Sequence, residues 1–127
     1  MKRVFIIDDD PMHAFILNKY LCRMNVFNPI VEFTDATKAI DHLTKHKDNE
    51  GLLPDIILLD LNMPKMNGWQ FLEAFEKISL SKRPSVYILS SSVMREDQDR
   101  AKGIACIDDY FVKPISMKML EKLILSS

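Results

Sequence analysis

Five short apolar runs recur along the chain, and each is followed by polar or charged residues. The runs are continuous instead of alternating, which is typical of strands buried on both faces of a parallel sheet. They are also rich in β-branched and aromatic residues, which favour extended structure. This pattern predicts strands over residues 4–7, 30–33, 55–60, 86–89 and 110–112.

The segments between these runs carry apolar residues at helical spacing. Asp10 followed by Pro11 suits an N-cap and the first position of a helix, and it predicts a helix over residues 11–24. Asn28–Pro29 is expected to break the chain before the second strand, and Gly103 to end the fourth helix. The remaining helices are predicted to begin at Asp35, to begin at Asn67–Gly68, to cover 93–101 and to begin at Ser116.

Strands and helices alternate through the whole chain. The predicted fold class is therefore α/β, with a doubly wound parallel sheet and helices on both of its faces. The last helix is expected to turn Leu120, Leu123 and Ile124 towards the sheet. Because 127 residues is an ordinary size for one domain, we expect residues 1–127 to form a single domain.

Composition narrows the functional classes. Hydrophobic residues make up 47% of the chain and charged residues 28%, which is typical of a globular protein. The formal net charge of −1 gives no electrostatic reason to expect binding to nucleic acid or to an anionic membrane. No apolar run is long enough to span a bilayer or to serve as a secretory signal. Cys22 and Cys106 lack metal-type spacing, so we expect reduced thiols in a cytoplasmic protein.

Chemically informative residues follow four of the five strands. Ligands of doubly wound folds bind at the carboxyl ends of the strands. Three carboxylates in one partly dry site repel one another, and a hard Mg²⁺ ion with oxygen ligands relieves that conflict. With a cation and a hydroxyl nearby, such a site is suited to accepting a phosphoryl group. These residues are Asp8 and Asp9 after the first strand, Asp60 after the third, Ser90 after the fourth and Lys113 after the fifth.

This set of residues, in this order and spacing, resembles the receiver domain of bacterial two-component response regulators, and the single-domain, chemotaxis-receiver-like members in particular. The match also includes Pro64, Gly68, Tyr110 and Pro114. The resemblance implies a flavodoxin-like (βα)5 fold, a three-layer sandwich whose parallel strands have the order 2-1-3-4-5. It also implies that Asp60 is the residue that is phosphorylated.

The resemblance assigns a role to each other position. Mg²⁺, with Mn²⁺ as an alternative, would be held by Asp8, Asp9, Asp60 and the backbone carbonyl of Asn62. Lys113 would bind a phosphoryl oxygen, and its bond to Pro114 would be cis. Ser90 would move to bond the phosphoryl group, and Tyr110 would then swing inward as a switch. Asn62 and Ser92 would flank the path of attacking water and tune the rate of dephosphorylation.

The partners implied by the resemblance are proteins. The phosphoryl group would come from a phosphohistidine of a sensor histidine kinase or a histidine phosphotransfer protein. The acyl phosphate would switch a surface made of the fourth helix, the fifth strand and the last helix, which binds an unknown downstream protein. We expect no output domain, no direct contact with nucleic acid or membrane, and a monomer or a phosphorylation-dependent dimer. Such a protein catalyses its own phosphorylation and dephosphorylation but is not a turnover enzyme.

Other interpretations of these residues are weaker. A phosphohydrolase that uses an aspartyl phosphate needs a second acid two residues after the nucleophile, where this chain has Asn62. A structural receiver that takes no phosphate would not need the complete site. His42 and His46 are spaced for a metal on one helix, but a solvated helix face is the simpler explanation. His13 is expected to be an exposed neighbour of the acidic site and not an acid–base catalyst. Asp109, where relatives often have glycine, is expected in the loop that enters the fifth strand.

Overall fold

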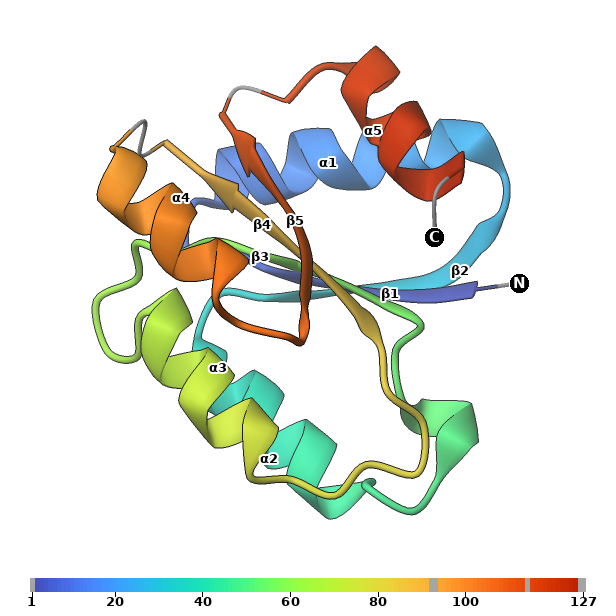
Figure 1. Cartoon of the computed structure of the whole chain (residues 1–127). Coiled ribbons are helices and arrows are strands. Elements are labelled where there is room, and N and C mark those ends of the chain that lie inside the picture. The colour runs from blue at the N-terminus through green and yellow to red at the C-terminus, as the bar shows by residue number, and fades with distance from the viewer. Residues whose placement is uncertain (1, 92–93, 114, 126–127) are drawn as a thin grey trace.

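The computed structural model describes residues 2–91, 94–113 and 115–125. It forms one five-stranded parallel sheet in the order β2-β1-β3-β4-β5, which confirms the predicted fold class and strand order (Figure 1). The elements in chain order are β1 (Lys2–Ile7), α1 (Pro11–Met24), β2 (Phe27–Phe33), α2 (Ala36–Lys45), a short 3₁₀ helix (Glu50–Leu52), β3 (Ile56–Leu59), α3 (Gly68–Glu76), β4 (Ser85–Ser90), α4 (Arg95–Lys102), β5 (Ile107–Val112) and α5 (Met117–Leu125).

Helices cover both faces of the sheet, so its central strands are buried on both sides. Figure 1 shows α1 and α5 on one face and α2 and α3 on the other. Successive residues of β1 point to opposite faces, so Phe5 and Ile7 join the core under α2 and α3, while Val4 and Ile6 join the core under α1 and α5. This two-sided burial is the reason that the apolar runs are continuous.

Polar residues begin α1, α2, α3 and α5 as the sequence predicts. Asp10 caps α1, and its carboxylate accepts hydrogen bonds from the backbone N–H groups of Met12 and His13. Asn67 and Gln70 form a reciprocal capping box at the start of α3. Similar contacts begin two further helices, where the side chain of Asp35 caps α2 and the Ser116 hydroxyl accepts a hydrogen bond from Met119 N–H.

The last two helices agree with the prediction in part. Helix α4 covers residues 95–102 instead of 93–101, and Gly103 is its C-cap, as predicted. Ala101 is its only residue described as buried, so α4 is held by little apolar contact. In α5, Leu120 is fully buried, as expected, whereas the side chains of Leu123 and Ile124 lie outside the described part of the chain.

Strands β2 and β5 each begin three residues earlier than predicted. Strand β2 starts at Phe27 and includes Asn28–Pro29, whose peptide bond is cis, so the predicted chain break there is wrong. Proline is tolerated because β2 is an edge strand and its register with β1 shifts beside Pro29. Strand β5 starts at Ile107, so Asp109 lies in the strand and not in the loop before it.

A β-bulge explains the earlier start of β5. Val86 pairs with Ile107 and Tyr87 with Asp109, so Asp108 is an extra residue between two paired positions. The carboxylate of Asp108 accepts the N–H of Val86 at 3.0 Å. An acidic side chain therefore substitutes for a backbone acceptor, which a search for apolar runs does not detect.

In the described residues, no helix has the length and apolar character needed to cross a membrane.

Candidate functional site

The carboxyl ends of β1 and β3 bring the predicted acids together. Asp8 N–H donates to the carbonyl of Phe33 at 3.0 Å, and Asp60 N–H donates to the carbonyl of Ile7 at 2.9 Å. Both residues thus continue the hydrogen-bond pattern of the sheet by one step beyond the strands. Carboxylate oxygens of Asp8, Asp9 and Asp60 all lie within 4.8 Å of one another. Asp8 and Asp60 are 1% and 5% exposed, so two of the three acids are buried.

A close backbone contact fixes the loop that carries Asp60. Gly68 N–H donates to the carbonyl of Leu61 at 2.9 Å. A Cβ atom at position 68 would lie 2.8 Å from Leu61 Cα and 2.9 Å from the carbonyl oxygen of Asp60. Those distances are shorter than van der Waals contact, and backbone atoms cannot move aside as a flexible side chain can. Gly68 therefore lets the start of α3 pack directly against the residue that follows Asp60.

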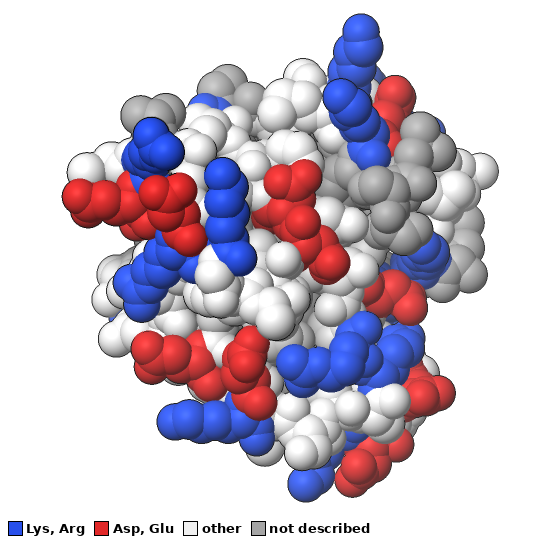
Figure 2. All heavy atoms as spheres, viewed as in Figure 1, with Lys and Arg blue, Asp and Glu red and all other residues white. Residues whose placement is uncertain are grey.

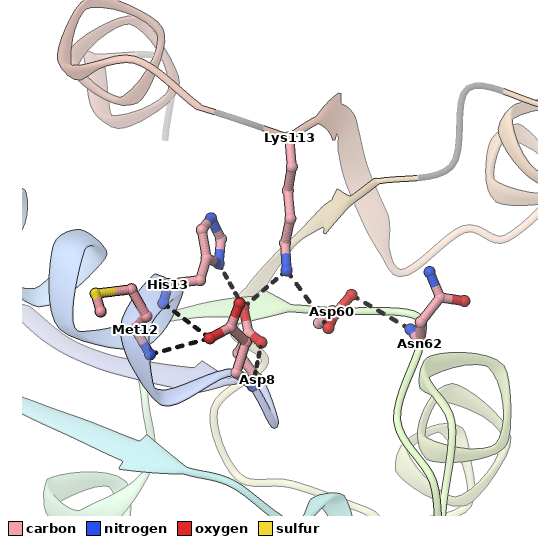
Figure 3. Close-up of polar contacts among 7 residues, drawn as sticks. Asp8, Met12, His13, Asp60, Asn62 and Lys113 are labelled. Carbon is pink, nitrogen blue, oxygen red and sulfur yellow. Dashed lines mark hydrogen bonds and ion pairs between the residues drawn. The ribbon is translucent and has the colours of Figure 1, made fainter.

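Lys113 joins the two buried acids (Figure 3). Its Nζ lies 3.0 Å from Asp8 Oδ2 and 3.5 Å from Asp60 Oδ2. The backbone places this side chain, because Lys113 N–H donates to the carbonyl of Ser90 at 2.7 Å immediately after β5. The ammonium therefore sits between two carboxylates that come from different strands.

His13 was missed as a member of the site. We expected an exposed neighbour, but the side chain is only 12% exposed and its Nδ1 lies 2.5 Å from Asp8 Oδ2. His13 is the third residue of α1, and side chains in the first turn of a helix point back towards its N-terminus. The predicted cap at Asp10 therefore already implied that the imidazole would turn back towards the end of β1.

The two buried acids differ in how they ionise. For Asp8, burial alone would raise the pKa, but hydrogen bonds from His13 and from Asp10 N–H, together with the charge of Lys113, hold the pKa below its ordinary value. For Asp60, burial raises the pKa to about 6, and the negative charge of Asp8 adds to this effect. Lys113 and the N–H of Asn62 oppose the rise without cancelling it. One acid is thus firmly ionised, and the other is easily protonated.

Comparison with known proteins identifies the family. The model of the response regulator receiver domain matches residues 4–125. The chain belongs to this family. The structure is similar to that of a two-component response regulator from Cytophaga hutchinsonii, with a TM-score of 0.82 and 31% identity over 98% of this chain and 94% of that one.

Two further proteins are similar to this chain. The phosphate regulon transcriptional regulatory protein PhoB of Escherichia coli is 30% identical over 121 residues. That match covers 94% of this chain and 48% of PhoB, so this chain spans about half the length of that relative. The receiver domain of the sensor histidine kinase PA1611 from Pseudomonas aeruginosa has a TM-score of 0.80, at 15% identity over 98% of this chain and 95% of that one. That likeness is one of fold, and that protein has a magnesium ion coordinated in its active site cleft.

The structure describes three of the remaining predicted residues of the receiver site. Ser90 is fully buried at the end of β4, where it pairs with Val112 of β5. Tyr110 is half-buried in β5 and lines a cavity of about 160 Å³ beside α4. Asn62 is exposed, and its N–H donates to Asp60 Oδ1 at 3.3 Å. The metal-binding role of the Asn62 carbonyl stays a prediction, and Ser92 and the bond to Pro114 lie outside the described residues.

The expected solvated face for the histidine pair, His42 on α2 and His46 at its C-cap, is only partly observed, because both side chains are half-buried. His42 is partly buried, its ring centroid is 5.2 Å from that of Phe5, and its Nε2 lies 3.1 Å from the carbonyl oxygen of Leu52. The rings of His42 and His46 pack against each other at 4.6 Å. Within the described ranges, the only group of three or more potential metal-binding side chains is Asp8, Asp9 and Asp60. His42 is therefore part of the packing of α2 on the sheet, and His46 packs against His42.

The donor set of the receiver site fits Mg²⁺. Three carboxylates from two strand ends offer hard oxygen ligands, and the clustered negative charge needs a cation in addition to Lys113. Asp9 is the most accessible of the three acids, because both others are buried. This arrangement leaves one side of the cluster open to a hydrated ion, which Mg²⁺ requires because it keeps several of its waters.

Proposed function

We propose that this receiver domain takes a phosphoryl group from a phosphohistidine onto Asp60. The observation that carries the proposal is the convergence of Asp8, Asp9 and Asp60 with the ammonium of Lys113 at one sheet edge. In the forward step, a carboxylate oxygen of Asp60 forms a bond to phosphorus. The bond from phosphorus to the donor imidazole breaks, and its electron pair returns to that ring nitrogen. Water later attacks the phosphorus, which releases inorganic phosphate and restores the carboxylate.

The site residues position and neutralise the transferred group. Lys113 turns from Asp60 to a phosphoryl oxygen, and the buried Ser90 hydroxyl donates to another. Asp8 and Asp9 would hold a Mg²⁺ ion together with Asp60. When bound, that ion supplies the positive charge that offsets the carboxylates and the incoming oxygens. The magnesium ion in the cleft of the PA1611 receiver domain supports this assignment.

The phosphohistidine must reach Asp60 from a second protein, and we propose that α1 supplies its docking surface. Apolar side chains on the first half of α1 are unusually exposed beside the acids, with Met12 at 67%, Phe15 at 54% and Ile16 at 39%. A helix face of this kind is typical of a protein contact. The donor, a sensor histidine kinase or a histidine phosphotransfer protein, would cover it and present its imidazole to the open side of the site.

We propose that the output surface is formed by α4, β5 and α5. Lys113 and Ser90 connect β5 to β4 directly at the site. Tyr110 lines the cavity between β5 and α4, so it can turn inward when Ser90 moves. Helix α4 buries little apolar surface, so a small change in its position costs little free energy. Figure 2 shows acidic and basic side chains side by side on the face that carries α3 and α4, so the downstream protein must match charges of both signs.

Acetyl phosphate tests the proposal without a cognate kinase. With Mg²⁺, the wild-type protein should gain the mass of one phosphoryl group, and chelation of the metal with EDTA should prevent it. Asp60→Asn keeps the size of the side chain but removes the nucleophilic oxygen, so it should gain no mass. An equal gain in Asp60→Asn would overturn the assignment of Asp60.

A further inference from the structure

The contact between His13 and Asp8 is part of a closed set of local hydrogen bonds. Asp10 N–H donates to Asp8 Oδ1 at 2.9 Å, and the Asp10 carboxylate accepts N–H groups from the first turn of α1. The third residue of that turn, His13, reaches back to Asp8 Oδ2 (Figure 3). The end of β1 and the start of α1 therefore hold each other in place through these polar side chains.

The surroundings of the imidazole indicate which nitrogen carries the proton. Nδ1 faces a carboxylate oxygen, so it must donate an N–H to make a hydrogen bond. Nε2 is buried without a hydrogen-bond partner in the described structure. A proton on Nε2 would leave a buried N–H unsatisfied, whereas a bare lone pair there is a smaller loss. The geometry therefore favours a ring that donates from Nδ1, so His13 adds a hydrogen-bond donor to the site.

Donors occupy most of the Asp8 carboxylate. Oδ2 faces both His13 Nδ1 and Lys113 Nζ, and Oδ1 accepts the N–H of Asp10. These three contacts fix the plane of the carboxylate and leave mainly Oδ1 for a metal or its bound water. If Lys113 leaves to bind a phosphoryl oxygen, His13 still satisfies Oδ2. Without His13, the same movement would leave that buried oxygen bare.

We propose that His13 is a positioning residue of the Mg²⁺ site. It acts through Asp8, whose carboxylate it orients towards the metal while Lys113 moves between Asp8 and the phosphoryl group. The inference rests on the proposed phosphoacceptor function, because it assigns His13 to the same metal site. Partners that orient a metal ligand typically change metal affinity by about 10- to 100-fold when they are removed.

Two substitutions separate the hydrogen bond from the packing of the ring. His13→Phe keeps a ring of similar size but has no N–H. His13→Asn carries an amide nitrogen at the same number of bonds from the backbone as Nδ1, so it can restore the donor. Binding of Mn²⁺, followed as free ion by electron paramagnetic resonance, reports metal affinity without any phosphorylation. Thermal unfolding in EDTA shows whether each variant folds.

We expect His13→Phe to bind Mn²⁺ about 10-fold or more weakly than wild type, and His13→Asn to recover most of that loss. In an Asp8→Asn background, His13→Phe should cause little further change, because its target carboxylate is gone. Wild-type affinity in folded His13→Phe would overturn the proposal for His13. Equal weakening by the Phe and Asn variants would also overturn it, because packing would then explain the loss. Failure of the wild-type protein to bind Mn²⁺ would instead count against the metal site itself.

Discussion

The ends of β1 and β3 carry two carboxylates of the same kind in very different surroundings. Asp8 receives His13 at 2.5 Å, Asp10 N–H at 2.9 Å and Lys113 at 3.0 Å. The contacts of Asp60 with Asn62 N–H at 3.3 Å and with Lys113 at 3.5 Å are longer. The fold places both acids at one edge, but local donors decide what each can do.

This difference fits the roles proposed for the two acids, Asp8 as an anchor for the metal and Asp60 as the phosphoacceptor. The donors around Asp8 keep its pKa low and its carboxylate fixed, which suits a residue that holds a metal. Burial raises the pKa of Asp60 to about 6, so its negative charge is poorly compensated until a cation arrives. A buried carboxylate with so little charge compensation is stabilised most by binding a metal ion and by forming a bond to a phosphoryl group.

The largest expected effect comes from removing the cation that both acids share. Lys113→Met should slow phosphorylation by acetyl phosphate about 100- to 1,000-fold, because a charge aimed at the phosphoryl oxygens is lost. It should also raise the pKa of Asp60 further, while His13 and Asp10 keep Asp8 ionised. Intact mass spectrometry over time measures the rate. Lys82→Met is the matched control, because Lys82 pairs with Asp55 at 3.0 Å outside the site and should not change the rate.

A smaller effect is expected from changing Gly68, whose close packing holds the loop that carries Asp60. Gly68→Ala should reduce the free energy of unfolding by about 1–3 kcal/mol, because the new Cβ meets backbone atoms of the Asp60 loop. Urea denaturation measures this change. In the control Gly103→Ala, the nearest atom to the new Cβ is Arg100 O at 3.5 Å, which is an ordinary contact. Equal stability of the two variants would show that the close approach at Gly68 does not constrain the loop.

The difference in ionisation also has a pH-dependent consequence for stability. In the folded protein Asp60 binds a proton with a pKa of about 6, above its ordinary value of 3.8, so ionisation destabilises the fold as pH rises from about 4 to 6. Asp60→Asn has no charge to bury. In EDTA at pH 7 we expect it to be about 1–2 kcal/mol more stable than wild type, with the difference vanishing below pH 4.

The control for that measurement is the other acid. The pKa of Asp8 is lowered, so its contribution to stability is present above pH 4 and is lost as pH falls below its ordinary value. Asp8→Asn should therefore be less stable than wild type at pH 7. If both substitutions change stability in the same direction at pH 7, the two acids do not differ as described.

The smallest expected effect concerns the exposed side of Asp60. Asn62 is exposed beside that carboxylate, so a larger charged residue there should change the access of water to the acyl phosphate. Asn62→Arg should alter the lifetime of the phosphorylated form by about 10-fold or less, which is below the roughly 100- to 10,000-fold effect of a group that itself transfers a proton. Loss of the phosphoryl mass after removal of acetyl phosphate measures the lifetime. The same lifetime in both proteins would exclude Asn62 from a tuning role.

Sequence reasoning was most reliable where a pattern had a simple physical cause. Continuous apolar runs followed by acids predicted the buried strands and the edge where Asp8 and Asp60 meet, because parallel strands place their carboxyl ends together. The helix over residues 11–24 was predicted with its exact bounds, since Asp10 and Pro11 fix its start. The structure therefore adds little to the fold class, and much more to the chemistry of the acids.

The predictions from sequence were wrong where polar side chains take the place of backbone acceptors or pack in the interior. Asp108 accepts a backbone N–H and extends β5 beyond the apolar run. His42 packs its ring on Phe5, although its sequence position resembles a solvated face. His13 was expected to be an exposed neighbour of the acidic site, yet it is largely buried and contacts Asp8. Each of these residues depends on contacts that hydrophobic periodicity does not encode.

The most direct test asks which carboxylate becomes the acyl phosphate. Borohydride reduces a phosphorylated aspartate to homoserine, and tandem mass spectrometry of the digested protein then locates the changed residue. After incubation with acetyl phosphate and Mg²⁺, we predict homoserine at position 60 and unchanged aspartate at positions 8 and 9. Homoserine at Asp8 or Asp9, or unchanged aspartate at all three positions, would contradict the assignment of Asp60 as the phosphoacceptor and of Asp8 as its anchor.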